Sequence, residues 1–312
     1  MPANIGRRLN ASTFALAKRT DSLLTHLSRV LSTPSGTDTT LCTLCYTLTL
    51  LHSQLTRLLG RQYEHLALAL ASKASESLLP GETVLASIEP PRTRLSETCA
   101  SVKALADVIA EFRIFVRLWG LLAIYQWARE TYIKPPRDAV VKTLVWAQIG
   151  ANTLFQIIEN GAYLASKGVL RGEAWARGRE GKWWIWSNRF WAAHILLELL
   201  RLLRVRQMQF NEEFGAQRDN VSAQGDDKTT VRSEVSMKSL AGLQYPDPMV
   251  SVQSKDLEKK WHRDFYANAA WFPLALHWSM AEEDSPVSET WLGVCGTIAG
   301  GIGLKELWKA TA

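Results

Sequence analysis

Residues 182–207 read KWWIWSNRFWAAHILLELLRLLRVRQ, with tryptophans crowded in the first half and leucines in the second. Ser187 is a suitable N-cap residue, and a helix that begins there has one narrow polar stripe, formed by His194, Glu198 and Arg201. The rest of its surface is apolar, so it must pack against other helices or contact lipid. We therefore predict a helix over about 187–209 in an all-α protein.

Other segments show the same helical periodicity. Leucines recur at alternating intervals of three and four, a seam typical of a helix that packs against a partner helix: Leu41, Leu44, Leu48, Leu51, Leu55 and Leu58. Further helices are predicted at about 97–127 and 139–164, separated by Pro135 and Pro136. No segment alternates as a strand would, which supports the all-α class.

Composition shifts divide the chain into four expected regions. Residues 1–96 form an N-terminal helical region, and 97–210 carry amphipathic and tryptophan-rich helices that we expect to associate with a membrane. Residues 211–260 are polar and poor in large apolar side chains, which predicts a flexible linker. Residues 261–312 are expected to form C-terminal membrane helices.

Charge and aromatic content favour an anionic partner. The 312-residue chain carries a net charge of +6 and 13 tryptophans, more than its tyrosines or its phenylalanines. Tryptophan prefers places that are apolar on one side and wet on the other, including membrane interfaces. The positive charge suits acidic lipid or nucleic acid and does not choose between them.

The sequence gives no sign of catalytic, cofactor or metal chemistry. Cys42 and Cys45 have CxxC spacing, but no second pair or Cys/His cluster completes a zinc site, so we interpret them as structural thiols. None of the local motifs G-x-S-x-G, H-E-x-x-H, G-x-G-x-x-G or the Walker lysine is present. We predict a protein that is not an enzyme and that has no cofactor.

Residues 102–119 predict an amphipathic interfacial helix. One arc of the helical wheel is apolar, and Val108 and Phe115 extend it; its members are Val102, Leu105, Ile109, Phe112, Val116 and Trp119. Arg113 and Arg117 border that arc, beside Lys103, where they can reach anionic headgroups while the apolar side chains enter the acyl region. The alternative is an ordinary amphipathic helix that covers a protein core.

The tryptophan-rich stretch predicts an interfacial anchor where a basic loop enters lipid. Its aromatic and basic members are Lys182, Trp183, Trp184, Trp186, Arg189 and Trp191. Nucleic-acid-binding surfaces expose aromatic side chains singly on a soluble scaffold, whereas these run directly into a leucine-rich helix. Lipid, or a membrane-embedded bundle, is therefore favoured over nucleic acid.

Residues 290–304, TWLGVCGTIAGGIGL, predict a glycine-rich membrane helix. Gly296 and Gly300 form a GxxxG pair, a close-packing face for helices in lipid, and Trp291 and Trp308 flank the segment. The charge-free stretch is slightly shorter than the about 20 residues that a spanning helix needs. A glycine-rich loop or a buried soluble helix is the alternative.

Three segments, in order, resemble the peroxin 11 family. KWWIWSNRFWAAHILLELLRLLRVRQ is similar to its W-S-x-R-x-W stretch and the basic-ended helix that follows, and AEFRIFVRLWGLLAIYQW (110–127) to its R-x-x-x-R-L-x-G helix. GVCGTIAGGIGLKELW (293–308) is similar to its glycine-rich C-terminal membrane segment. The resemblance covers about 97–312 except the expected linker, and it indicates a divergent, fungal-type member.

This resemblance implies a protein of the peroxisomal membrane that elongates the membrane and promotes peroxisome fission and proliferation. The expected mechanism is insertion of the 102–119 wedge together with self-association. The expected partners are anionic lipids, further copies of the chain and the fission machinery, without nucleic acid. The alternatives are a non-catalytic peripheral helical scaffold that binds protein partners and, third, a nucleic-acid-binding module.

Overall fold

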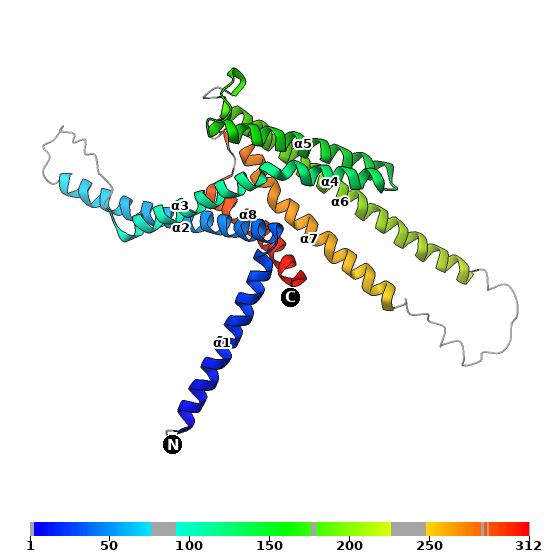
Figure 1. Cartoon of the computed structure of the whole chain (residues 1–312), viewed down its shortest axis with the longest axis horizontal. Coiled ribbons are helices and arrows are strands. Elements are labelled where there is room, and N and C mark those ends of the chain that lie inside the picture. The colour runs from blue at the N-terminus through cyan, green and yellow to red at the C-terminus, as the bar shows by residue number, and fades with distance from the viewer. Residues whose placement is uncertain are drawn as a thin grey trace. The chain divides into compact units, whose positions relative to one another are not determined.

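A computed structural model describes residues 3–75, 92–175, 179–225, 248–281, 284–285 and 287–311. Within these ranges the regular structure is entirely helical, which confirms the all-α prediction (Figure 1). The elements are α1 (Ala3–Leu31), α2 (Pro34–Ser75), α3 (Arg94–Val116), the 3₁₀ turn η1 (Arg117–Trp119), α4 (Gly120–Ile133), α5 (Ala139–Ser166), the 3₁₀ turn η2 (Glu173–Trp175), α6 (Glu180–Gly225), α7 (Pro248–Trp278) and α8 (Glu289–Ala310).

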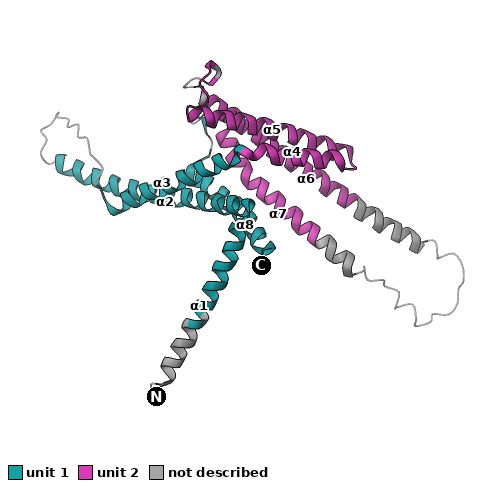
Figure 2. Cartoon of the chain, in the orientation of Figure 1, with its two compact units in different colours: residues 1–118, 280–312 teal, residues 119–279 magenta. Residues whose placement is uncertain are grey.

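The chain forms two compact units (Figure 2). Unit 1 combines Met1–Leu118 with Met280–Ala312, and unit 2 is Trp119–Ser279. The two ends of the sequence meet in unit 1 because α8 packs along α2. Such a contact between distant segments leaves no mark on local composition.

Glycines let α8 approach α2 closely in unit 1. A Cβ atom at Gly293 would lie 2.7 Å from the backbone of Leu50, and one at Gly300 would lie 2.7 Å from Thr43 Oγ1. Gly296 lies against the ring of Tyr46, where a Cβ would overlap the ring atoms. The structure therefore places the GxxxG pair at a helix–helix contact inside the chain.

The fully buried positions of α2 carry small residues, and no leucine of the seam is fully buried. Cys42, Cys45 and Ser53 are buried where α3 and α8 pack on α2. The seam residues Leu44, Leu51 and Leu58 remain 42–48% exposed, whereas Leu41, Leu48 and Leu55 are half-buried. The larger residues of this face, Tyr46 and Leu50, lie against the glycines of α8, which leave room for them.

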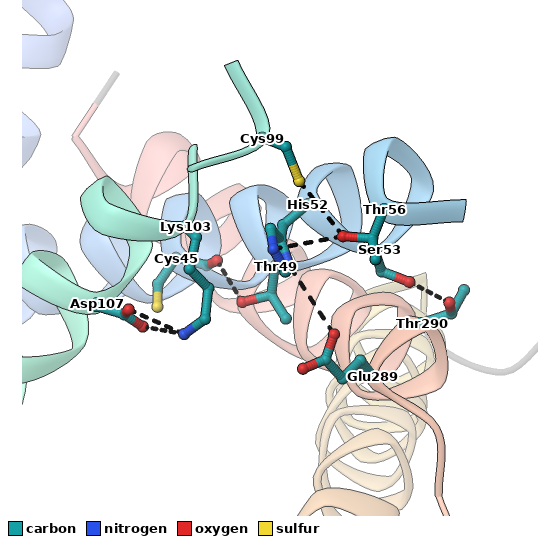
Figure 3. A network of polar contacts seen from close by, with 10 residues as sticks. All are labelled: Cys45, Thr49, His52, Ser53, Thr56, Cys99, Lys103, Asp107, Glu289 and Thr290. Atoms are coloured by element: carbon teal, nitrogen blue, oxygen red, sulfur yellow. Dashed lines mark hydrogen bonds and ion pairs between the residues drawn. The ribbon is translucent and has the colours of Figure 1, made fainter. Parts of the chain in front are cut away.

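A network of polar contacts links α2, α3 and α8 (Figure 3). The Ser53 and Thr290 hydroxyls are hydrogen-bonded to each other. The thiol of Cys45 donates to the carbonyl of Ala106 over 3.5 Å. At the start of α3, Ser96 N donates to Thr93 Oγ1 at 3.1 Å, and Thr93 N donates to Ser96 Oγ at 3.0 Å. This capping box satisfies free backbone donors and fixes where α3 begins.

The helix expected over 97–127 is interrupted. α3 ends at Val116, and the 3₁₀ turn η1 separates it from α4, which starts at Gly120. Gly120 lies against the side chain of Gln156, which leaves no room for a Cβ atom. α4 then ends at Ile133, just before Pro135 and Pro136, as the prolines predict.

Unit 2 is built around α5, which packs along α6 and also against α4. Ile124, Val145 and Ile149 form its apolar core, together with Val141. Asp138 starts α5 as predicted near 139: its carboxylate accepts from Val141 N at 2.9 Å and from Arg204 at 2.8 Å. The guanidinium of Arg204 and the Val141 backbone lower the pKa of Asp138.

The helices around the expected linker are longer than predicted. α6 begins at Glu180, before Ser187, and runs to Gly225, while α7 begins at Pro248. Residues 211–225 and 248–260, within the segment expected to be a flexible linker, are helical, and 226–247 lies outside the described residues. A polar sequence can continue a helix because the backbone hydrogen bonds are internal to it.

None of the helices in the described ranges is both long enough and apolar enough to cross a bilayer.

Candidate membrane interface

The outward face of α3 carries a continuous apolar stripe. Its members follow helical spacing and are each between 40% and 66% exposed: Leu105, Val108, Phe112, Phe115 and Val116, here called the α3 stripe. Large apolar side chains at intervals of three and four residues lie on one side of a helix. The α3 stripe is therefore a single surface of unit 1 that presents two phenylalanine rings and three aliphatic side chains to its surroundings.

The stripe is rotated relative to the arc expected from the sequence. Ile109, placed at the centre of the expected lipid-facing arc, is buried, and Val102 is half-buried. Cys99 and Ala106 share the buried side, where α3 packs on α2. Their small size allows close packing on that side, so Val108 and Phe115 face outward in place of Ile109.

Arg113 does not border a free surface. Its Nε donates to Asp38 Oδ1 at 2.9 Å, and only 12% of its side chain is exposed. Arg117 is half-buried, and Lys103 forms an ion pair with Asp107 along the helix, at 2.6 Å. The headgroup-facing role expected for Arg113 is thus replaced by an ion pair that joins α3 to α2.

Unit 2 presents a second apolar face, on α4, that the sequence reasoning missed. Trp119 was expected to be membrane-inserting and is 57% exposed. The following residues on the same side of α4 are also exposed: Leu122, Tyr125, Tyr132 and Ile133. The signal for this face was the continuation of the aromatic and aliphatic spacing beyond residue 119 as far as the prolines.

The four tryptophans of the 181–194 stretch have different environments. Trp186 is half exposed, and the guanidinium of Arg189 lies 4.9 Å from its ring centroid. Arg189 Nε also donates to the carbonyl of Ser279 at 3.0 Å, which fixes the cation over the ring. Lys182 is exposed near the start of α6. Trp186, Arg189 and Lys182 therefore form the exposed basic and aromatic part of this region.

The other rings pack inside unit 2. Trp191 is half-buried at the centre of an aromatic cluster, with ring centroids 6.0 Å from Trp271 and from Trp278 and 6.4 Å from Phe155. Trp183 is likewise half-buried, 5.1 Å from Trp175, and Trp184 is half-buried as well. The tryptophan-rich stretch is therefore largely a packing element with one exposed ring.

The outer side of α8 is apolar as well. Its glycines Gly293, Gly296 and Gly300 face α2, while Trp291 and Ile298 lie on the opposite side and are exposed.

No group of His, Cys, Asp and Glu suited to hold a metal ion occurs among the residues described. Burial raises the pKa of the Cys42 thiol to about 11, and it raises the pKa of Cys45 in the same direction.

Comparison with known proteins identifies one family. Residues 88–308, well over half of the chain, match the model of the family described as peroxisomal biogenesis factor 11 (PEX11). The matched interval contains the α3 stripe, the tryptophan-rich stretch and nearly all of α8. No curated protein and no solved structure matches the chain.

Proposed function

The chain belongs to the peroxisomal biogenesis factor 11 family, and from this premise we propose that it remodels the peroxisomal membrane and so promotes peroxisome fission and proliferation. The family is one of peroxisomal membrane proteins, which gives the location of the chain. It is a family of biogenesis factors rather than of enzymes. The proposed role is therefore mechanical and non-catalytic.

The α3 stripe is the observation that carries this proposal. Five large apolar side chains on one side of a helix are unfavourable in water, and their transfer into the acyl boundary of a bilayer is favourable. A helix that inserts this face into one leaflet expands that leaflet relative to the other. The bilayer then curves toward the protein, which is the deformation that elongation requires.

Other exposed side chains extend the proposed contact with lipid. The exposed face of α4, with Tyr125 and Tyr132, and the outer side of α8, with Trp291, carry rings that favour the headgroup level. Trp186 with Arg189 adds an aromatic ring and a cation suited to an anionic headgroup. We propose that these surfaces lie in the membrane interface, with acidic lipids as partners.

Self-association is proposed to concentrate these wedges through the leucine seam of α2. Leu44, Leu51 and Leu58 are seven residues apart and exposed, which is the spacing of one core position of a coiled coil. A second copy of the chain can bury them against its own seam. The resulting oligomer is also the form that we propose recruits the fission machinery.

The proposal is tested with the purified full chain and vesicles of phosphatidylcholine and an acidic phospholipid. The variant V108D/F112D/F115D places three carboxylates on the α3 stripe without altering a buried residue. We expect the natural chain to bind and tubulate the vesicles, and we expect the variant to lose at least about tenfold in binding, since each buried apolar side chain contributes about 1.5–3 kcal/mol. Equal binding by both proteins would contradict the proposed role of α3.

The matched control is L66D/L68D/L70D on α2, three exposed leucines of the same unit that lie outside the stripe. This variant has the same added charge and should retain binding. In cells that lack their own family member, the control should restore peroxisome number and the stripe variant should not. Failure of both variants would indicate that charge alone weakens binding.

A peripheral scaffold that binds protein partners is the second candidate, and the exposed seam of α2 favours it. The two functions separate in the same cells. If the stripe variant restores peroxisome number and a variant of the seam does not, protein binding through α2 is the function. The opposite result supports membrane insertion.

A further inference from the structure

Unit 1 contains an open apolar groove where the turn between α1 and α2 meets the last turns of α3. The groove has a volume of about 270 Å³. Its large apolar side chains come from all three helices: Leu31 from α1, Pro34 from α2, and Phe112 and Val116 from α3. All four residues are exposed, so the groove is an apolar surface that is open to its surroundings.

Hydrogen bonds hold the α1–α2 side of the groove in shape. Thr33 Oγ1 donates to the carbonyl of Val30 at 3.1 Å and accepts from Gly36 N at 3.1 Å. Thr37 Oγ1 donates to the carbonyl of Leu31 at 2.7 Å. Gly36 lies so close to the Val30 carbonyl that a Cβ atom there would overlap it. The groove is therefore preformed, and little order has to be imposed on it when a ligand binds.

The polar side chains of the lining already have partners. Arg113 Nε donates to Asp38 Oδ1 at 2.9 Å, so the two charges at the groove compensate each other. The hydroxyls of Ser32, Thr33 and Thr37 all donate to backbone carbonyls. A charged ligand would have to compete with the ion pair, whereas a hydrocarbon chain needs no polar partner. The lining therefore favours an apolar ligand.

The groove continues the α3 stripe. Phe112 and Val116 are members of the stripe and also line the groove. When the stripe enters the acyl region, as proposed above, the groove opens into the same hydrocarbon. Water in the groove would meet mostly apolar walls, and an empty groove would leave those walls without contacts. An acyl chain that follows Phe112 and Val116 into the groove removes both costs.

We propose that the groove takes up one acyl chain of a membrane phospholipid when α3 is inserted. The chain lies against Phe112 and Val116 and reaches Leu31 and Pro34. This inference rests on the proposed membrane function, to which it adds a binding site with a defined class of ligand. The bound lipid then ties α1 and α2 to the leaflet that α3 enters.

The test is photolabelling of the purified full chain on vesicles of phosphatidylcholine and phosphatidylglycerol. The probe is a phosphatidylcholine with a diazirine in the middle of one acyl chain, and mass spectrometry locates the labelled residues. A label on Thr37 reports the groove, because Thr37 lines it and does not belong to the α3 stripe. Labels on Leu105 or Val108 report the insertion of α3, because these residues do not line the groove. We expect both kinds of label on the natural chain.

Two variants close the groove in different ways. S32W fills it with a ring from an exposed lining position, and L31D places a carboxylate among its apolar side chains. Each variant should lose the label on Thr37 and keep the labels on the α3 stripe. The controls S35W and L23D make the same changes at exposed positions outside the lining, and they should keep both kinds of label.

The pattern of labels separates this inference from the proposed function. Labels on the α3 stripe alone in the natural chain would mean that α3 inserts and the groove takes no chain, which overturns the inference only. Labels on neither surface would contradict the insertion of α3, and the groove proposal with it. An unchanged label on Thr37 in both S32W and L31D would show that the probe reaches it by another route.

Two further results would assign the groove to another occupant and so overturn the proposal. A label on Thr37 that rises as the protein is diluted on the vesicles would show that a second copy covers the groove at higher density. A label on Thr37 that is lost when dodecanoate is added, while the labels on the α3 stripe remain, would assign the groove to a free fatty acid.

Discussion

Arg113 Nε donates a hydrogen bond of 2.9 Å to Asp38 Oδ1, which joins α3 to the N-terminal part of α2. The pair fixes the side of α3 next to the α3 stripe against α2, because the guanidinium is largely buried whereas the stripe is exposed. The orientation of the proposed membrane-inserting face thus depends on an ion pair within the fold.

We predict that D38N destabilises unit 1 by about 1–2 kcal/mol, because it leaves a buried guanidinium without its carboxylate while Asp38 itself is 43% exposed. The measurement is urea unfolding followed by far-UV circular dichroism. D107N, which breaks the exposed pair with Lys103, is the control and should change stability by less than about 0.5 kcal/mol. An equal effect of the two substitutions would contradict the prediction.

Because Arg113 is paired with Asp38, a substitution of Arg113 cannot test binding to lipid headgroups. R113E places a carboxylate beside Asp38, so weaker lipid binding by R113E would report a damaged fold. The aspartates of V108D/F112D/F115D avoid this confusion because their positions are exposed.

The glycines of α8 give a second prediction about unit 1. G296A should destabilise the unit by about 1–3 kcal/mol, because its Cβ would overlap the ring of Tyr46 in a well-packed contact. G301A has open space around its Cβ and should instead stabilise the helix by about 0.5–1 kcal/mol, the propensity difference between glycine and alanine. Thermal unfolding of the two variants in parallel measures this difference, and the same sign for both would refute it.

Helical periodicity predicted the helices of this chain better than it predicted their faces. α5 (Ala139–Ser166) lies where 139–164 was expected, because an N-cap, an apolar period and flanking prolines are all local signals. For α3 the wheel gave one apolar arc that contained Ile109 and was extended by Val108, and the small residues Cys99 and Ala106, on the side that packs on α2, determine that Ile109 is buried and Val108 exposed. Local spacing cannot show which side a distant helix will cover.

The polar stripe of α6 shows the same limit. His194, Glu198 and Arg201 were predicted only as a polar stripe, and the structure brings Gln148, 50 residues before Glu198, into a hydrogen bond with the Glu198 carboxylate. Likewise Trp186 and Trp191 stand in similar sequence surroundings, yet only Trp191 meets Trp271 and Trp278 of α7. These partners are set by tertiary packing, which the sequence pattern does not carry.

The cysteines of α2 are predicted to be unreactive in the folded chain. Cys42 and Cys45 are buried free thiols, and burial raises the pKa of Cys42 to about 11, so few thiolates form near pH 7. Maleimide should label half-buried Cys295 first and should reach Cys42 and Cys45 only in denaturant, as peptide mass spectrometry can show. Rapid labelling of Cys42 in the native chain would show that α2 opens from α3.

The leucine seam gives a prediction about assembly. L44Q/L51Q/L58Q should lower the apparent mass of the purified chain in analytical ultracentrifugation, because it replaces three exposed apolar side chains that a second copy is proposed to cover. The helix content should stay the same, since glutamine is a good helix former. L66Q/L68Q/L70Q is the control and should keep the mass of the natural chain; a natural chain that is monomeric at all concentrations would disprove self-association through α2.

The buried imidazole of His194 predicts a pH dependence of stability in unit 2. Burial lowers its pKa below the ordinary 6.5, partly offset by the backbone of Gln148 and the charge of Glu198; Arg201 and Asp264 are the other charges nearby. At pH values between the lowered pKa of His194 and 6.5, the unfolded chain binds more protons than the folded chain. The free energy of unfolding therefore falls as the pH drops below about 6.5. It levels off once the pH is below the pKa of His194 in the folded chain. The pKa of Glu198 is lowered, because its hydrogen bonds and the charge of Arg201 outweigh the effect of burial. Protonation of Glu198 therefore lowers the free energy of unfolding only below about pH 4.5.

Denaturant unfolding between about pH 5 and pH 8 separates the two groups, since carboxylates titrate largely below that window. H194F should remove the decline below pH 6.5, and H65F, which changes an exposed histidine of α2, should keep it. If H194F and the natural chain have the same slope, protons are taken up elsewhere on unfolding and the buried imidazole does not control the stability of unit 2.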